Sequence, residues 1–525
     1  MDISAEKNVI EQLDHIDAVN LAKASDVTQL VEQDLVPWYR KKNLRTLYIA
    51  LVPSALGVEM TSGYDGSVLN GLQAVKSWLD YFNNPRGAIL GIVTAAFSLG
   101  AVGAIPAVPW VNDRFGRKAS IKLGSVFILI GVILQTASVN IAMFLVSRFI
   151  LGAGIPFAIN GASQLIAELA YPKERGVITG LFNESWYVGS ILAAAITLGT
   201  YQMSSTWAWR LPSLFQIIPS LLQITFIWFV PESPRWLVSQ DRSEEAFDIL
   251  VKYHAEGNRD DPFVIAEFRQ IRETIHLEKE ASNSSWIELF KSRANLHRLL
   301  IASCIGLFSQ WSGNGLVSYY LAEVLATIGI TDTRRQNQIN LGLQCWNLVS
   351  GVSGALIAKS LRRRWQYLLS FGGMTVVFAC WTAASAIFAQ NGNHNAASAV
   401  VAMIFIYYGF YNLMHPLTYM YLTEVFPFIS RSKGVAITQF FSRAGSSFNQ
   451  FVNPIGLGNL GWKFYLVYNV WLACETVVIF FGYSETKGPT LEELSIVFEG
   501  KKANVELVHV RNKEGAPETG QNEKI

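Results

Sequence analysis

The sequence predicts an all-α membrane protein with twelve transmembrane helices in two pseudo-symmetric halves of six. Hydrophobic residues make up 51% of the 525-residue chain and charged residues only 16%, whereas about a quarter of a soluble domain is charged. The apolar residues gather in runs that are each long enough to cross a bilayer. Basic loops between these runs and an internal repeat, described below, support the same architecture.

Twelve apolar runs are predicted as spans. Inside a bilayer only helices and closed barrels satisfy the backbone, and runs of this length indicate helices. The predicted spans are 45–68, 87–110, 119–137, 141–165, 177–200 and 211–230 in the first half, and 298–325, 337–358, 366–389, 397–425, 433–457 and 462–483 in the second. The predicted organisation is an N-terminal tail (1–44), a first half (45–230), a helical linker (231–296), a second half (297–483) and a C-terminal tail (484–525).

Basic residues are concentrated in the loops on one side of the predicted bundle. Cytoplasmic loops carry an excess of Lys and Arg, so these loops, the linker and both termini are expected in the cytoplasm. The residues are Arg114, Arg117 and Lys118 after span 2, Lys173 and Arg175 after span 4, Lys359 and Arg362–Arg364 after span 8, and Arg431 and Lys433 after span 10.

Composition also excludes several classes of protein. The net charge of +2 gives no basic footprint for a nucleic acid. The first 44 residues lack the basic-then-apolar layout of a cleavable signal peptide. All four cysteines fall in predicted spans, and their spacing suggests neither a disulfide framework nor a metal site. No nucleophile–base set stands out, so we expect no enzyme and no cofactor.

Three segments of the first half recur about 250 residues later. Asp113–Lys118 after span 2 is echoed by Lys359–Arg364 after span 8. Glu168 and Arg175 are echoed by Glu424 and Arg431, and Pro231–Arg235 by Ser484–Gly488. Two parallel halves of this kind place a substrate site near the bilayer midplane, between them.

Together these motifs resemble the sugar porter family of the major facilitator superfamily over residues 45–498. The matching segments are Gly63–Asp65, Asp113–Lys118, Arg148, Pro231–Leu237 (PESPRWL) and Ser484–Leu494 (SETKGPTLEEL). PESPRWL followed by a C-terminal ETKG is highly specific, whereas the Asp113–Lys118 loop marks only the superfamily. Glu323, within Tyr319–Ile330, is similar to the fungal branch, which includes lactose and hexose permeases.

Asp65 is the most informative single position, because an acid inside a span is costly and usually functional. The resemblance implies proton coupling through Asp65, paired with Arg148, since uniporters of the family tend to carry Asn there. A carboxylate beside an arginine stays ionised, and separating the pair during transport would favour protonation. A static structural pair is the alternative.

The resemblance further implies a cytoplasmic gating network of salt bridges that holds the outward-open state. A basic face that only fixes topology is the alternative. Lys359 and Arg362 replace the acid and the glycine of the motif, so the latch of the second half is expected to be weaker or differently paired. The network comprises Asp113, Arg114, Arg117, Glu168, Arg175, Glu232 and Arg235 in the first half, and Glu424, Arg431 and Glu485 in the second.

Sugar binding in this family uses neutral amides, hydroxyls and aromatic rings, and several of these positions are changed here. Ser309 and Gly315 stand where the family has glutamine and asparagine, so the cavity is expected to be reshaped. Helix–helix hydrogen bonding is the alternative role for each polar residue. The expected substrate-binding residues are Asn183, Gln310, Asn314, Asn347, Tyr419 and Arg443.

Arg443 is the largest departure, since it replaces a tryptophan near the bilayer centre, where an unpaired charge is costly. It either contacts an acidic or highly hydroxylated substrate or forms an ion pair within the membrane, and the second reading is slightly favoured. The candidate partners are Glu184, Glu475 and Glu59.

The leading functional hypothesis is therefore a monomeric plasma-membrane symporter that imports a mono- or disaccharide with protons. An alternative is a transporter of another polyhydroxylated or acidic metabolite, such as quinate, working as importer or exporter. A third is a non-transporting sugar sensor. Sensors of the family tend to have long cytoplasmic tails, and the tail here has only about forty residues, which argues against that role.

Overall fold

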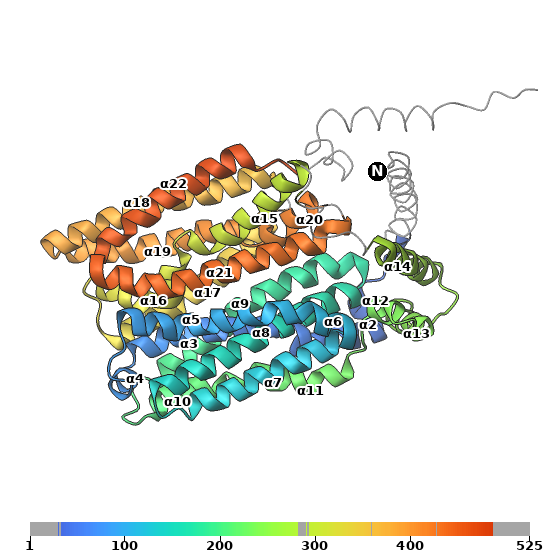
Figure 1. Cartoon of the computed structure of the whole chain (residues 1–525), viewed down its shortest axis with the longest axis horizontal. Coiled ribbons are helices and arrows are strands. Elements are labelled where there is room, and N and C mark those ends of the chain that lie inside the picture. Colours follow the sequence, from blue (N-terminus) through green and yellow to red (C-terminus); the bar gives the residue numbers. More distant parts are fainter. Residues whose placement is uncertain are drawn as a thin grey trace, which may run out of the picture.

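The computed structural model describes residues 30, 33–281, 290, 293–358, 360–426 and 428–486, and every regular element in them is a helix (Figure 1). The helices of the first half are α2 (Lys42–Leu51), α3 (Val58–Ala74), α4 (Lys76–Tyr81), α5 (Gly87–Ala104), α6 (Val108–Phe115), α7 (Arg117–Thr136), α8 (Ile141–Leu169), α9 (Pro172–Thr200), α10 (Trp207–Phe215) and α11 (Ile217–Phe226).

The remaining helices form the linker and the second half. The linker contains α12 (Pro234–Ser239), α13 (Ser243–His254) and α14 (Pro262–Ala281). The second half contains α15 (Arg293–Trp311), α16 (Asn314–Ala326), α17 (Thr333–Ile357), α18 (Arg363–Asn391), α19 (His394–Met414), α20 (Leu417–Val425), α21 (Phe428–Leu460) and α22 (Phe464–Gly482).

The described helices outnumber the crossings, since several crossings consist of two helices separated by a break. Twelve crossings result. The first is α2, a π-helical turn at Val52–Leu56 and α3; the second joins α5 to α6, and the sixth joins α10 to α11. The seventh breaks between α15 and α16 at Gly313, whose φ is 98°. The tenth breaks between α19 and α20 at Pro416, which cannot donate a helical hydrogen bond. The predicted fold class is thus confirmed.

By length and composition alone, seven helical stretches in the described part of the chain are apolar enough to cross a membrane. The other crossings carry more polar residues. The first crossing extends to Ala74, whereas the sequence predicted an end at residue 68. It is longer because Asn70 and Gln73, which look like loop residues, are buried against α16.

Figure 1 shows the two halves side by side, with the linker helices α12–α14 at one end and α4 at the other. We call these the linker end and the α4 end. Across the boundary between the halves, α5 packs on α21 and α9 on α17, while α3 contacts α16 and α17. Within the first half α3 lies against α9 so closely that a Cβ on Gly63 would meet the Trp186 carbonyl oxygen at 1.8 Å.

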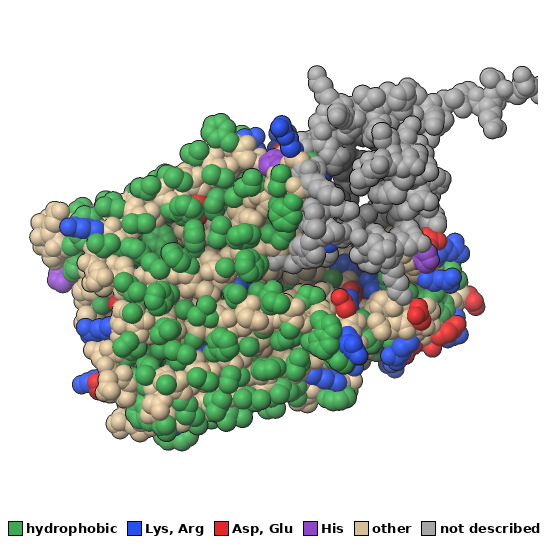
Figure 2. Space-filling view, in the orientation of Figure 1, with side chains coloured by type: hydrophobic (Ala, Val, Ile, Leu, Met, Phe, Trp, Pro, Cys, Tyr) green, Lys and Arg blue, Asp and Glu red, His purple; other side chains and the backbone are tan. Residues whose placement is uncertain are grey.

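Apolar side chains cover the flanks of the bundle, and charged side chains gather at its ends, most of all at the linker end (Figure 2). Large hydrophobic residues such as Trp228, Val376, Val470 and Phe481 are more than half exposed on these flanks. A surface of this kind suits hydrocarbon rather than water.

The linker is tied to the first half by buried and capping contacts. Glu256 accepts hydrogen bonds from the backbone N–H groups of Asn43 and Leu44, 3.0–3.1 Å away, and so caps the start of α2. His254 is buried between the Glu267 carboxylate (2.7 Å) and the Leu169 carbonyl oxygen (3.2 Å). The linker therefore contacts both the start of α2 and the end of α8 at the linker end.

Candidate functional site

Asp65 on α3 and Arg148 on α8 form a buried ion pair in the middle of the first half. The two Nη atoms of Arg148 donate to the two carboxylate oxygens of Asp65 over 3.0 and 2.9 Å. Only 2% of each side chain is exposed. Arg148 Nε also donates to the Val93 carbonyl oxygen (3.0 Å), and Gln216 Nε2 donates to Asp65 Oδ1 (3.1 Å).

This geometry makes the pair specific and hard to break. A bidentate guanidinium–carboxylate contact fixes both groups in one plane. Removing one partner of a buried ion pair leaves an uncompensated charge, which costs about 3–5 kcal/mol. The carboxylate can therefore be released from Arg148 only if α3 and α8 shift or if the carboxylate takes up a proton.

Gln310 and Asn314 lie on either side of the break in the seventh crossing. Gln310 Nε2 donates to the Ser442 hydroxyl on α21 (3.2 Å). Asn314 Nδ2 donates to the Tyr411 hydroxyl on α19 (2.9 Å), while its Oδ1 is buried without a hydrogen-bond partner. The break thus places one amide on each side of it at the centre of the second half, and leaves the Asn314 amide oxygen without an internal partner.

Asn347 on α17 is linked to the first half through Asn412 on α19. Asn412 Nδ2 donates to the Asn347 carbonyl and amide oxygens (3.4 and 3.3 Å) and to the Ser350 hydroxyl (2.7 Å). The Asn412 amide oxygen accepts from the hydroxyl of Tyr187 on α9. This chain of polar groups crosses the boundary between the halves near the midpoint of the helices.

The other expected substrate residues differ in how they are placed. Asn183 is half-buried on α9 and makes no hydrogen bond with a described residue. Arg443 is half-buried on α21, and in the described structure it contacts none of its three candidate acids. Glu475 accepts from Trp471 Nε1, and Glu184 lies 3.8 Å from His415. The side chains of Tyr419, Glu424 and Arg431 fall outside the described residues.

At the α4 end the two halves are joined by Asn70 and Gln73 of α3. The helix α16 is broken at Tyr320 (φ −137°, ψ 32°). Asn70 Nδ2 donates to the Val317 carbonyl oxygen (3.1 Å), and Asn70 Oδ1 accepts from Leu321 N–H (3.0 Å). An unbroken helix would join these two backbone groups to each other, so Asn70 replaces the missing helical bond.

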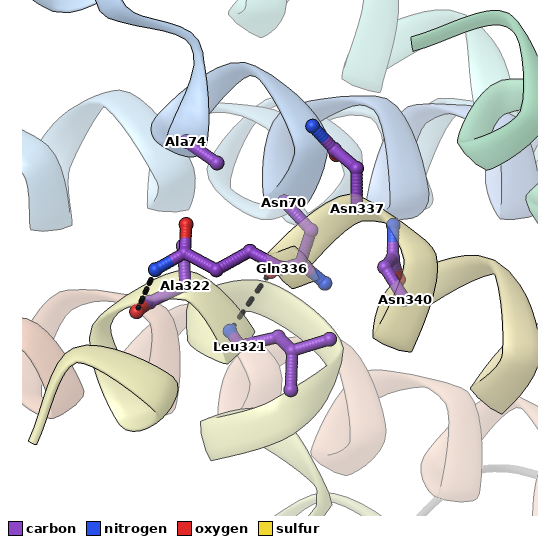
Figure 3. A pocket seen from close by; sticks show the side chains of 7 residues that line it. All are labelled: Asn70, Ala74, Leu321, Ala322, Gln336, Asn337 and Asn340. Carbon is purple, nitrogen blue, oxygen red and sulfur yellow. Dashed lines mark hydrogen bonds between the residues drawn. The ribbon is translucent and has the colours of Figure 1, made fainter. Parts of the chain in front are cut away.

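A small recess at this junction is lined by Asn70, Ala74, Leu321, Ala322, Gln336, Asn337 and Asn340 (Figure 3). Gln73, outside the recess, donates to the Tyr319 carbonyl oxygen (2.8 Å). Gln336 donates to the Ala322 and Ile330 carbonyl oxygens, all within the second half. Among the described residues, polar contacts between the two halves occur from the α4 end as far as the level of His415. No such contact between described residues lies closer to the linker end than His415. The α4 end is therefore the closed end.

Three predicted network residues meet at the linker end of the first half. Arg117 donates two hydrogen bonds of 3.2 Å to the Glu168 carboxylate. Glu232 accepts from the backbone N–H groups of Arg117 and Lys118 (both 3.2 Å) at the start of α7. Burial raises the pKa of the Glu232 carboxyl, and the backbone N–H groups and the nearby charges of Lys118 and Arg117 oppose this rise.

Four other predicted members are more loosely placed. The Asp113 side chain makes no hydrogen bond, although its carbonyl oxygen accepts from Trp236 Nε1 (2.9 Å). Arg114 lies over the ring of Trp110. The charge of Arg175 is repelled by that of Arg235 and attracted by the carboxylates of Glu267 and Glu168.

The second half repeats the Glu232 arrangement with Glu485. Glu485 accepts from the backbone N–H groups of Arg363 (2.9 Å) and Arg364 (3.2 Å), at the start of α18. Each half thus uses an acid that follows its sixth crossing to cap the start of its third.

Replacing Glu232 with alanine is expected to lower the unfolding free energy by about 1–2 kcal/mol, because the start of α7 loses a charged cap. Glu485→Ala is the matched variant and should have a similar effect through α18. The thermal unfolding midpoint of the purified protein measures both. Unchanged midpoints in both variants would contradict the capping role.

Gln216, Tyr187, Asn412 and Asn70 join the site although the sequence did not single them out. Each is a polar residue in an otherwise apolar crossing, which is the available signal, since polar groups at such depth are normally hydrogen-bonded to another helix. The sequence contains many such residues, and nothing in their spacing shows which ones meet.

Comparisons with known proteins give matches over most of the chain. The sequence model of the family described as “Sugar (and other) transporter” matches residues 50–498. The high-affinity glucose transporter of Kluyveromyces lactis is 27% identical over 451 residues, which cover 82% of this chain and 81% of that protein. The MFS-type transporter oryC of Aspergillus oryzae is 31% identical over 460 residues, covering 84% of each.

Solved structures give the same fold. A partially occluded inward-open structure of the xylose transporter XylE from E. coli has a TM-score of 0.71 at 21% identity. The match covers 85% of this chain and all of that chain.

Proposed function

Because the chain belongs to the sugar (and other) transporter family of the major facilitator superfamily, we propose that it imports a mono- or disaccharide together with protons, by alternating access. It is an integral, multi-pass membrane transporter rather than an enzyme. One of the named relatives is a glucose transporter, which favours a sugar over the acidic or secondary metabolites considered as alternatives.

The observation that carries the proton part is the Asp65–Arg148 pair. Asp65 is the one acid in the described crossings that an arginine binds through both carboxylate oxygens and that is almost fully buried. Protonation of Asp65 would free Arg148, so proton binding is coupled to the packing of α3 on α8. Gln310, Asn314 and Asn347, with Asn183 and Tyr419, supply the sugar site between the halves.

The linker end, both termini and the basic loops lie in the cytoplasm in this proposal, and the membrane is the plasma membrane. With the α4 end outside, the described structure is closed to the exterior. The network at the linker end, from Asp113 to Arg235 with Glu424, Arg431 and Glu485, closes the cytoplasmic side in the opposite state. A monomer suffices, because the site lies between two halves of one chain, divided near residues 231–296.

Uptake of a labelled sugar panel, with and without a protonophore, tests this function. We expect at least one neutral mono- or disaccharide to accumulate above its external concentration, and the protonophore to abolish the accumulation. Uptake that the protonophore leaves unchanged would refute the proton coupling. Uptake of a sugar acid or quinate in place of every neutral sugar would favour the alternative substrate class.

A further inference from the structure

Four ionisable side chains face one another across the boundary between the halves, separate from the Asp65–Arg148 pair. Glu59 on α3 and Glu184 on α9 belong to the first half. Arg443 on α21 and His415, between α19 and α20, belong to the second half. His415 Nδ1 lies 3.8 Å from Glu184 Oε1, and its ring is 5.9 Å from that of Tyr187.

Glu59 and Arg443 lie at matched depth. The crossing that contains Glu59 runs from Lys42 to Ala74, and the helix that contains Arg443 runs from Phe428 to Leu460. Both start at the linker end and both have 33 residues, with Glu59 eighteenth and Arg443 sixteenth. At 1.5 Å per residue each lies roughly 23–26 Å from the start of its crossing.

Glu59 faces the space between the halves rather than lipid. α3 is enclosed by α9, α11, α16 and α17, and its residues from Thr61 to Ala74 are all buried. Glu59, by contrast, is only half-buried, just to the linker side of this sealed stretch.

Arg443 lies near Glu59 across the boundary between the halves. Its charge and that of His415 act on the Glu59 carboxyl, although the three side chains are not in contact. Glu59 and Arg443 make no hydrogen bond or ion pair with a described residue. Each therefore presents unused hydrogen-bonding groups, acceptors from the first half and donors from the second.

The balance of charge decides which ligand suits this space. A lone Arg443 would favour an anion, but Glu59 stands opposite it, and Glu184 faces His415. Each base thus has an acid across the boundary, so an acidic ligand would meet two carboxylates and a cationic ligand a guanidinium. A neutral polyol can donate hydroxyl protons to the carboxylate and accept from the guanidinium, and such charge-assisted hydrogen bonds are about twice as strong as neutral ones.

We propose that Glu59 and Arg443 are a recognition pair that binds the hydroxyls of a neutral sugar from both halves at once and rejects sugar acids and amino sugars. This assignment rests on the proposed function and names its substrate class. It also gives Arg443 a role in place of the tryptophan that the family usually carries at this position.

Three labelled substrates test the pair in cells that lack other sugar carriers: glucose, glucuronate and glucosamine. The wild type should favour glucose. Glu59→Gln leaves an uncompensated cation and should lower glucose affinity about tenfold while raising the glucuronate-to-glucose uptake ratio by at least that factor. Arg443→Gln leaves an uncompensated anion and should raise the glucosamine-to-glucose ratio instead.

The controls separate recognition from folding. Glu59→Asp and Arg443→Lys keep the charges and should retain the wild-type ratios. Glu475→Gln removes a carboxyl that is bonded to Trp471 inside the second half and should leave the ratios unchanged. Uptake is normalised to the transporter present at the cell surface.

The outcomes are distinguishable. A wild type that prefers glucuronate, or Gln variants whose substrate ratios do not change, would overturn the recognition pair and leave the proposed sugar transport standing. A wild type that takes up no neutral sugar from a wider panel would overturn the proposed function, and the recognition pair with it.

Discussion

Replacing Asp65 with asparagine is expected to abolish the accumulation of sugar against its gradient while sugar exchange across the membrane continues. Asparagine has nearly the same shape and can still accept a hydrogen bond from Arg148 through its amide oxygen. It cannot bind and release a proton in the physiological range. The ratio of internal to external sugar should therefore fall from well above one to one, as measured with a labelled sugar in reconstituted vesicles under an imposed pH gradient.

The asparagine variant is preferable to removal of the arginine. Arg148→Ala would leave the Asp65 carboxylate buried and unpaired, at a cost of about 3–5 kcal/mol, so loss of transport could reflect loss of folding. Glu475→Gln is again a matched control, because it removes another buried intramembrane carboxyl. Accumulation that persists in Asp65→Asn and still collapses with a protonophore would refute the role given to Asp65.

The second large effect is expected from Asn70→Leu at the α4 end. The leucine is similar in volume but leaves the Val317 carbonyl and the Leu321 N–H, freed by the break at Tyr320, without their partner. It also removes the hydrogen bond from Asn70 to the Ser318 carbonyl oxygen. At about 1 kcal/mol for each bond, the closed α4 end loses roughly 3 kcal/mol, or about 100-fold in its population relative to the open state.

Thiol labelling measures this shift. A cysteine placed at Ala74, which lines the recess of Figure 3, should react faster with an external, membrane-impermeant reagent when Asn70 is replaced. Gln336→Leu serves as the control, since Gln336 bonds only to carbonyl groups of its own half. Equal labelling rates in the Asn70 and Gln336 variants would show that Asn70 does not hold this end closed.

The fold could be predicted from the sequence because hydropathy, basic loops and repeated motifs depend on composition and order alone. The Asp65–Arg148 pair was expected from the resemblance to the sugar porter family, whose motif places an arginine beside this acid. The structure brings the two side chains together as expected. The high cost of an unpaired charge inside an apolar crossing agrees with that pairing.

The neutral part of the site was harder to predict. Asn412 and Tyr187 are two of many uncharged polar residues in the crossings, and their meeting depends on helix rotation and on the break at Pro416. The polar role of Asn70 depends on the irregular backbone at Tyr320, which no motif signals. For Arg443 the sequence named three acids, and it could not show that two of them are engaged elsewhere.

The caps formed by Glu232 and Glu485 have a mechanical consequence. In each half the segment that leaves the sixth crossing is fastened to the first turn of the third, so that the half forms a closed loop of helices. Each brace keeps the third and sixth crossings of its half together at the linker end, so these two crossings are expected to move together when the halves change position.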